Sequence, residues 1–155
     1  RREESGEGRE KRREGREKRR EEREKRREKR EKREGGGKAV HYRDLIVWRK
    51  AMEAAREVYR LVPDLPREEL YGMRSQLTRA AVSIPANIAE GWTRESKREK
   101  SQFLAIAQGS LAEAETLLTL CEQVGWVPEG ETGTLRALLD EVSRMLTVMR
   151  RKNRA

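Results

Sequence analysis

Apolar residues beyond position 40 recur at intervals of three and four, the spacing that gathers them along one side of an α-helix. The pattern predicts four helices, at about 42–62, from about Arg67, at 96–124 and at 132–151. No segment alternates apolar and polar residues with a period of two over a useful length, so no strands are expected. Because short connections join antiparallel neighbours, the sequence predicts an all-α, antiparallel, up-down-up-down four-helix bundle.

The residues expected to face the interior are those that repeat at this spacing. In the first two helices they are Leu45, Trp48, Met52, Ala55, Tyr59, Val62, Leu70, Met73, Leu77, Ala80, Ala81, Ile84 and Ile88. In the last two helices they are Phe103, Ile106, Ala107, Ser110, Leu111, Ala114, Leu117, Leu118, Cys121, Val124, Leu135, Leu138, Val142, Met145 and Met149.

Local signals mark where these helices begin, bend and end. Pro63 closes the first helix, because a proline disfavours helical backbone in the residue before it. Pro85 falls inside the second helix, where its ring removes one backbone hydrogen bond, so a kink is expected rather than a stop. Ser96 has Glu99 at the offset of a capping box, and Gly125 suits the position just beyond a helix end.

Charge divides the chain into two parts. Residues 1–37 hold 18 Lys and Arg, 12 Asp and Glu and no large apolar side chain, whereas residues 38–155 hold 19 and 16. The formal net charge of +9 is therefore +6 on the first part and +3 on the second. We predict a charged, low-complexity extension with a glycine linker at 1–37, joined to a four-helix bundle domain at 38–155.

From Arg9 the extension repeats every seven residues, as REKRREG, REKRREE, REKRREK and REKREGG. Its glutamates step by four and three, and pairs such as Glu14 with Lys18 have the order that supports a helix. A cationic helix of this kind can bind phosphates in a salt-dependent way. We favour instead a solvated extension without a binding role, because the interleaved glutamates cancel most of its field.

The composition offers little for cofactor or metal chemistry. Cys121 is the single cysteine and His41 the single histidine, so neither a disulfide framework nor a zinc site is expected. No apolar run approaches the roughly 20 residues that span a bilayer, and residues 1–30 lack the apolar core of a signal peptide. Ser83 and Ser110 have no histidine within reach for nucleophilic catalysis. We predict a cytoplasmic, non-enzymatic protein without cofactor, metal, small-molecule substrate or membrane contact.

Three stretches resemble a known bacterial family. They are DLIVWRKAMEAAREVYRLV, YGMRSQLTRAAVSIPANIAEGWTR and FLAIAQGSLAEAETLL, within Tyr42 to Met149. They are similar to the four-helix bundle proteins called 23S rRNA intervening-sequence proteins, a family that includes the accessory variability determinant (Avd) of diversity-generating retroelements. The resemblance implies a homopentamer with a basic surface that contacts structured RNA or DNA and, in the Avd branch, a reverse transcriptase.

The predicted topology brings the start of the first helix, the connection between the second and third, and the end of the fourth to one end of the bundle. The cations that form this nucleic-acid-binding hypothesis are Arg43, Arg94, Lys97, Arg98, Lys100, Arg150, Arg151 and Lys152. The opposite end is expected to be acidic, with Asp64, Glu68, Glu69, Glu122, Glu129 and Glu131 against Arg60 and Arg67. The basic end can contact phosphates; alternatively, the cations that end the fourth helix only complement its dipole.

Seven residues of the second helix are candidates for a subunit interface or a family motif: Arg74, Arg79, Ser83, Pro85, Asn87, Glu90 and Trp92. We expect Asn87 and Glu90 to satisfy backbone groups that Pro85 frees, or to bond across a subunit contact, rather than to catalyse. The two arginines can pair with Glu90 or face a neighbouring subunit. Trp92 can stack on a base, although we favour a subunit contact.

These observations predict a non-enzymatic, oligomeric adaptor that binds RNA or DNA through its basic end, with a reverse transcriptase as a further partner in the retroelement branch. The alternative is a structural or protein-interaction module whose charges only keep it in solution. The two hypotheses differ in where the cations lie. In the first they converge on one surface, and in the second they are scattered and neutralised by glutamates.

Overall fold

The computed structural model describes Glu22, residues 40–128 and residues 130–153. Residues 1–40 and 41–155 are separate units, and the predicted extension at 1–37 lies outside the described residues except for Glu22. From Val40 on, the described residues contain four α-helices and no strand, so the all-α class is confirmed. The elements are η1 (Tyr42–Asp44), α2 (Ile46–Leu61), η2 (Val62–Asp64), η3 (Arg67–Glu69), α3 (Met73–Thr93), α4 (Lys97–Gln123) and α5 (Gly133–Lys152), where η marks a 3-10 turn.

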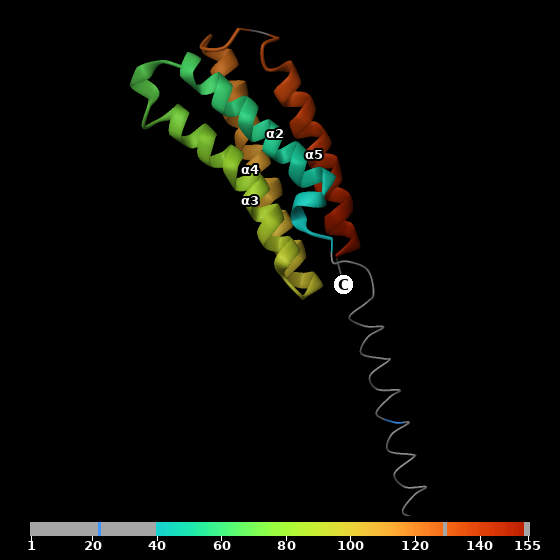
Figure 1. Ribbon diagram of the computed structural model, residues 1–155. Helices are drawn as coiled ribbons and strands as arrows, with labels where there is room; N and C mark the ends of the chain where they lie inside the picture. The colour runs from blue at the N-terminus through green and yellow to red at the C-terminus, as the bar shows by residue number, and fades with distance from the viewer. Residues whose placement is uncertain (1–21, 23–39, 129, 154–155) are drawn as a thin grey trace, which may run out of the picture. The chain divides into compact units, whose positions relative to one another are not determined.

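The four α-helices pack side by side as a four-helix bundle (Figure 1). α3 contacts α2 and α4, and α5 contacts the same two helices from the other side. Side-chain bonds between α4 and α5 join Gln108 to Ser143 at 2.8 Å, whereas Arg136, near the start of α5, reaches Thr119 and Glu122, near the end of α4. Contacts in this order run between antiparallel helices.

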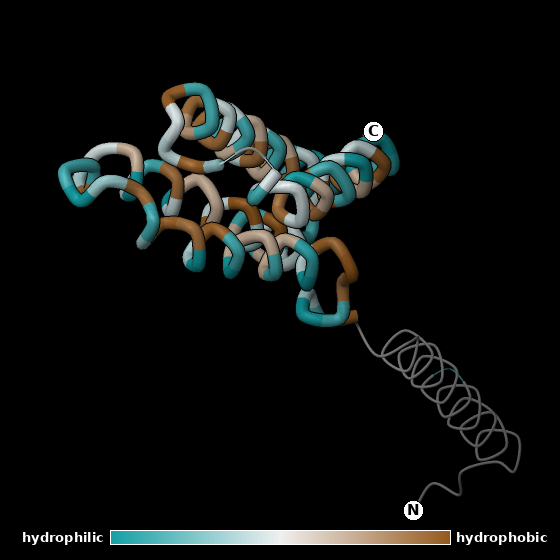
Figure 2. Tube along the Cα trace, turned by 90° about the horizontal axis from the view of Figure 1, so that it is seen from above, coloured by the Kyte–Doolittle hydropathy of each residue, from teal (hydrophilic) through white to brown (hydrophobic). Residues whose placement is uncertain are grey.

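Each helix turns one apolar side toward a common core, seen in Figure 2 as brown turns that alternate with teal ones. α2 differs from the prediction. Its buried side chains are small, at Val47, Ala51, Ala54, Ala55 and Val58. Met52 and Tyr59, which were expected inside, are 37% and 58% exposed. Of the other predicted residues, Ala55 is buried and Leu45, Trp48 and Val62 are partly buried against the core. The side of α2 that faces inward is therefore shifted toward the smaller side chains.

The other helices follow their predicted stripes more closely. α3 buries every predicted core residue from Met73 to Ile88, although Leu70, which precedes the helix, is 53% exposed. In α4 the predicted positions Ile106 and Val124 are largely exposed, and Leu104, which was not predicted, is buried. In α5 the buried residues are Leu135, Leu139, Val142 and Leu146, with Leu138, Met145 and Met149 partly buried against them.

Two predicted helix starts are wrong. The first predicted helix opens with the 3-10 turn η1 and is broken at Leu45, whose extended backbone (φ −70°, ψ 126°) separates η1 from α2. The second was expected from about Arg67, but that residue begins another 3-10 turn and α3 starts at Met73. The Glu69 carboxylate accepts a hydrogen bond from the Met73 amide at 2.9 Å, which satisfies a backbone donor at the true start of α3.

The reason given for Pro63 is wrong, because Val62 before it keeps helical backbone (φ −55°, ψ −37°) and α2 passes directly into the 3-10 turn η2. Ser96 and Gly125 mark helix ends as expected, although the Glu99 carboxylate bonds to the Ser96 hydroxyl, so only half of the predicted capping box forms. Ser96 caps α4, because its hydroxyl accepts from the Glu99 amide at 3.2 Å and bonds to the Glu99 carboxylate at 2.7 Å. Gly125 follows the end of α4 with a φ of +77°, a conformation that favours glycine. α3 continues through Pro85 to Thr93 without a stop, and the kink expected there stays a prediction. None of the helices in the described part of the chain is long and apolar enough to cross a membrane.

α3 and α4 approach each other closely at Gly91, near the end of α3. A methyl group added there would lie 2.9 Å from Cβ of Phe103 and 3.5 Å from the carbonyl oxygen of Lys100. A Cβ–Cβ distance this short forces a backbone to move, because neither atom lies at the end of a flexible side chain. Gly91 therefore sets the separation of the two helices at the α3–α4 connection.

We predict that Gly91→Ala lowers the free energy of unfolding by about 1–2 kcal/mol, since the steric clash outweighs the gain in helix propensity. Gly109→Ala is the matched control. No atom lies within 4 Å of its added methyl group, so the same substitution should stabilise the protein by about 0.5–1 kcal/mol. Urea unfolding followed by circular dichroism measures both. Equal effects at the two positions would contradict a close contact at Gly91.

Candidate nucleic-acid interface

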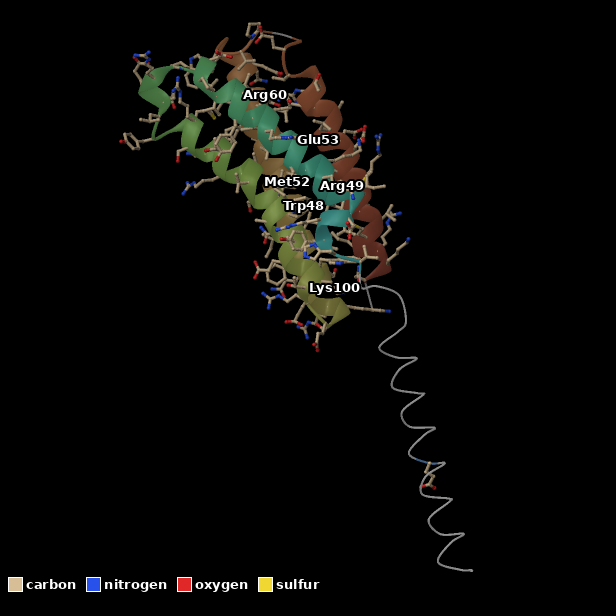
Figure 3. All side chains as sticks on the ribbon, in the orientation of Figure 1. Trp48, Arg49, Met52, Glu53, Arg60 and Lys100 are labelled. Atoms are coloured by element: carbon tan, nitrogen blue, oxygen red, sulfur yellow. The ribbon has the colours of Figure 1, made fainter. Side chains whose placement is uncertain are left out.

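The eight predicted cations come from three places: η1, the α3–α4 connection with the first turn of α4, and the last turn of α5. Figure 1 draws these three places at the same end of the bundle. In Figure 3, Lys100 and Arg60 lie at opposite ends. We call the end that carries Lys100 the basic end. The structure thus brings these residues together by position.

Five of these cations are exposed: Arg43, Lys97, Arg98, Arg151 and Lys152. None of them forms an ion pair with an acidic side chain among the residues that the structure describes. Their charges are therefore available to an anionic ligand.

The side chains of the other three cations, Arg94, Lys100 and Arg150, are half-buried. Arg94 pairs with Glu90 at 2.5 Å, and its guanidinium carbon lies 4.7 Å from the centre of the Phe103 ring. The Lys100 ammonium lies 5.1 Å from the centre of the Trp92 ring. Cations over aromatic faces are held by the ring electrons. These side chains shape the basic end more than they offer free charge.

Several acidic side chains of this end bond within their own turn. Asp44 accepts a hydrogen bond from the His41 amide at 3.2 Å and lies 3.9 Å from Arg49. Glu99 is part of the Ser96 cap. With Glu90 held by Arg94, the acid left exposed in this region without such a bond is Glu95. Asp44 and Glu99 keep their charge, but their carboxylates bond within the caps and form no ion pair with the five exposed cations.

Comparison with known proteins assigns the family. The model of the 23S rRNA-intervening sequence protein family matches residues 43–148, more than half of the chain. The chain belongs to this family. The match runs from η1 to the last turns of α5, so it covers the bundle and most of the basic end. No curated protein matches.

A solved structure supports the fold of this family member. It is the crystal structure of a protein with unknown function from the S23 ribosomal protein family of Bacteroides thetaiotaomicron, which superposes with a TM-score of 0.63. The two sequences are 24% identical, and the match covers 68% of this chain and 98% of the other. At this identity the likeness concerns the fold alone.

In this family member, polar residues of α3 form hydrogen bonds within the helix and to α4. The Asn87 side-chain amide donates to the Ser83 carbonyl at 2.8 Å and to the Ser83 hydroxyl at 2.9 Å. Asn87 thus bonds to backbone near buried Pro85, but at Ser83 and not at the carbonyl of Ala81, whose usual helical donor is missing because proline has no N–H. The Ser83 and Ser110 hydroxyls bond at 2.8 Å and join α3 to α4, a contact that sequence spacing did not reveal.

Glu90 pairs with Arg94, one helical turn away, so the pairing with Arg74 or Arg79, which was one of two alternatives for these arginines, is not the one that forms. Arg74 donates instead to the carbonyl oxygens of Pro63, at 3.1 Å, and Leu65, and so ties α3 to the α2–α3 connection. Arg79 is exposed. Whether any of these residues faces a second subunit stays a prediction.

The opposite end of the bundle is organised around Glu122. Arg136 donates to both of its carboxylate oxygens, at 3.2 and 2.7 Å, and buried Thr132 donates to one of them. These hydrogen bonds, that of Arg136 first, lower the pKa of Glu122. Beside this cluster a pocket of about 210 Å³ is lined in part by Glu57, Asp64 and Glu131. Glu129 lies outside the described residues, and Arg136 was not foreseen from the sequence.

We expect Glu122→Gln to lower the free energy of unfolding by about 1 kcal/mol near pH 7. The reason is that the charged, bidentate contact with Arg136 is lost. Since the folded pKa of Glu122 is lowered, this difference is fully present above the ordinary value of 4.5 and disappears as the pH falls through the folded pKa. Unfolding curves between pH 7 and pH 2 measure it. Asp140→Asn, which breaks an exposed pair with Arg144, is the control and should cost less than about 0.5 kcal/mol.

Proposed function

We propose that this chain is a non-enzymatic adaptor that binds RNA or DNA through its basic end. The observation that carries the proposal is the set of exposed cations at that end that form no ion pair with a described acid. Cations of this kind neutralise phosphates and release the counterions condensed on the nucleic acid. The acids nearby are engaged in caps and local pairs, so they compete little for these cations.

The arrangement favours binding over the alternative that the cations only complement helix dipoles. That alternative accounts for Arg151 and Lys152, which end α5. It does not account for Lys97 and Arg98, which occupy the first turn of α4. The positive end of the helix dipole disfavours cations there and favours anions. Two exposed cations at a helix N-terminus are explained if an anion binds beside them.

We predict that the variant Lys97→Gln/Arg98→Gln/Arg151→Gln weakens RNA binding and makes it less dependent on salt. Wild-type affinity should fall steeply between about 50 and 200 mM salt. In the variant the plot of log K against log salt should be less steep, its slope smaller in magnitude by roughly 2–3. Fluorescence anisotropy on the full chain measures both quantities. Arg94 is left intact, because its loss would also unpair Glu90.

The matched control for this experiment is Arg56→Gln/Arg67→Gln/Arg79→Gln. It removes the same charge from exposed arginines that lie outside the basic end. Equal losses in the two triple variants would show that net charge alone, including that of the extension, governs binding. In that case the basic end would not be the binding surface.

We further propose that the adaptor is a homo-oligomer, with five copies as the family resemblance implies. Ile46 and Tyr59 of α2 are 62% and 58% exposed, and an assembly is one way to cover them. Light scattering on the full chain should give a mass about five times that of the 18.1 kDa chain. A mass of one chain at micromolar concentration would exclude the oligomer.

A reverse transcriptase is the further protein partner that we propose if this chain belongs to the retroelement branch. The position of the gene separates the branches. A neighbouring reverse-transcriptase gene with a template repeat supports this partner, and a position inside a ribosomal RNA gene speaks against it.

A further inference from the structure

Aromatic rings are concentrated on the same side of the molecule as the free cations. Four of the seven Phe, Tyr and Trp residues, Tyr42, Trp48, Trp92 and Phe103, take part in ring–ring or cation–ring contacts there. In Figure 3, Trp48 lies in the half of the bundle that ends at Lys100. Phosphate binding requires cations alone, so these rings call for a separate explanation.

A fifth ring, that of His41, is exposed and lies beside Tyr42 in the 41–44 turn, by which we mean His41 and η1. The His41 ring lies 4.3 Å from the Tyr42 ring, centre to centre, at 36°. Tyr42 is half-buried, and the edge contact that it makes with Trp48 has a centre-to-centre distance of 5.4 Å. Trp48 in turn packs against the core. The rings therefore form a continuous series from the core to the surface, with His41 outermost.

Hydrogen bonds hold the backbone of this turn in place. His41 Nδ1 accepts from the Arg43 amide at 3.3 Å, and the His41 amide donates to the Asp44 carboxylate at 3.2 Å. Arg49 of α2 donates through Nε to the Arg43 carbonyl at 2.9 Å. The cap fixes the imidazole through Nδ1, so the ring is oriented before any ligand binds. A preorganised ring loses little conformational entropy on binding.

We propose that the 41–44 turn stacks an unpaired base, so that the basic end prefers single-stranded nucleic acid to duplex. The inference rests on the proposed function, because the cations supply the phosphate contacts. The 4.3 Å between the His41 and Tyr42 rings leaves no room for a base between them. The base therefore stacks on the outer face of His41.

The neighbouring charge suits this arrangement. The Arg43 guanidinium lies 5.8 Å from the centre of the Tyr42 ring and forms no ion pair with a described acid. It is placed to contact the phosphate of the stacked nucleotide. Bases inside a duplex are already stacked on one another and present only their edges, whereas an unpaired base offers its face to a protein ring. A ring platform beside cations thus selects single strands and loops over paired bases.

The test is a binding comparison with the full chain carrying His41→Asn and Tyr42→Leu. Asparagine keeps a side-chain acceptor at the cap, and leucine keeps an apolar contact for Trp48, so the rings are removed while the turn is retained. The probes are an unstructured 12-nucleotide RNA and its duplex of equal length, both fluorescently labelled. We expect the dissociation constant for the single strand to rise at least about fivefold. The constant for the duplex should stay within about twofold.

Tyr71→Leu is the control, because it removes a ring that is 92% exposed and lies outside both the 41–44 turn and the residues of the basic end. It should leave both constants unchanged.

His41→Asn alone is tested as well, so that a loss of packing around Tyr42 cannot explain the result. Circular dichroism checks that each variant is folded. His41→Asn alone should also raise the dissociation constant for the single strand.

The outcomes separate this inference from the proposed function. If the wild-type chain binds neither RNA at 50 mM salt, the proposed function fails and the inference fails with it. If the wild-type chain binds both RNAs, but the ring variants change neither constant or change both equally, stacking is overturned and phosphate binding by the basic end stands.

Discussion

Helices α3 and α4 meet where Gly91 leaves space for Cβ of Phe103, and the geometry of the basic end depends on this contact. Immediately beyond it the chain reverses, which places the Arg94 guanidinium over the Phe103 ring and the Lys100 ammonium over the Trp92 ring. The Ser83–Ser110 hydrogen bond joins the same two helices further along. A larger residue at the contact would separate the helices and move the first turn of α4, which carries the free cations, relative to the rest of the bundle.

The charges of the molecule are arranged by this packing and not by composition. Residues 38–155 carry a net charge of only +3, which by itself would indicate a weak field. At the basic end, acids such as Asp44 and Glu99 serve as caps for the turns that carry the cations. At the other end, both carboxylate oxygens of Glu122 accept hydrogen bonds from Arg136. A modest total charge is thereby divided into an end with exposed cations and an end where, beside the pairs of Glu57 and Glu122, the exposed acids Asp64, Glu68 and Glu131 gather.

The proposed phosphate contacts and the proposed base contact use different properties of the same surface. Phosphate contacts depend on exposed charge, act over several ångströms and tolerate any nucleic acid. A stacked base needs a flat ring held at the surface, which the capped 41–44 turn and the core-packed Trp48 provide. The combination would let a small bundle bind RNA or DNA generally and still distinguish an unpaired segment from a duplex.

The amino-acid sequence by itself determined the helical class, the burial of α3, the cap at Ser96 and the grouping of cations at one end, because each depends on local spacing or on chain order. It did not determine which side chains of α2 are fully buried, Ala51 and Ala54 or Met52 and Tyr59. That choice depends on how closely neighbouring helices approach, and small Ala51 and Ala54 allow a contact that Met52 and Tyr59 do not. Nor did spacing identify the partner of Glu90 or the ring series from Trp48 to His41. These contacts join segments whose relative placement only the packed bundle decides.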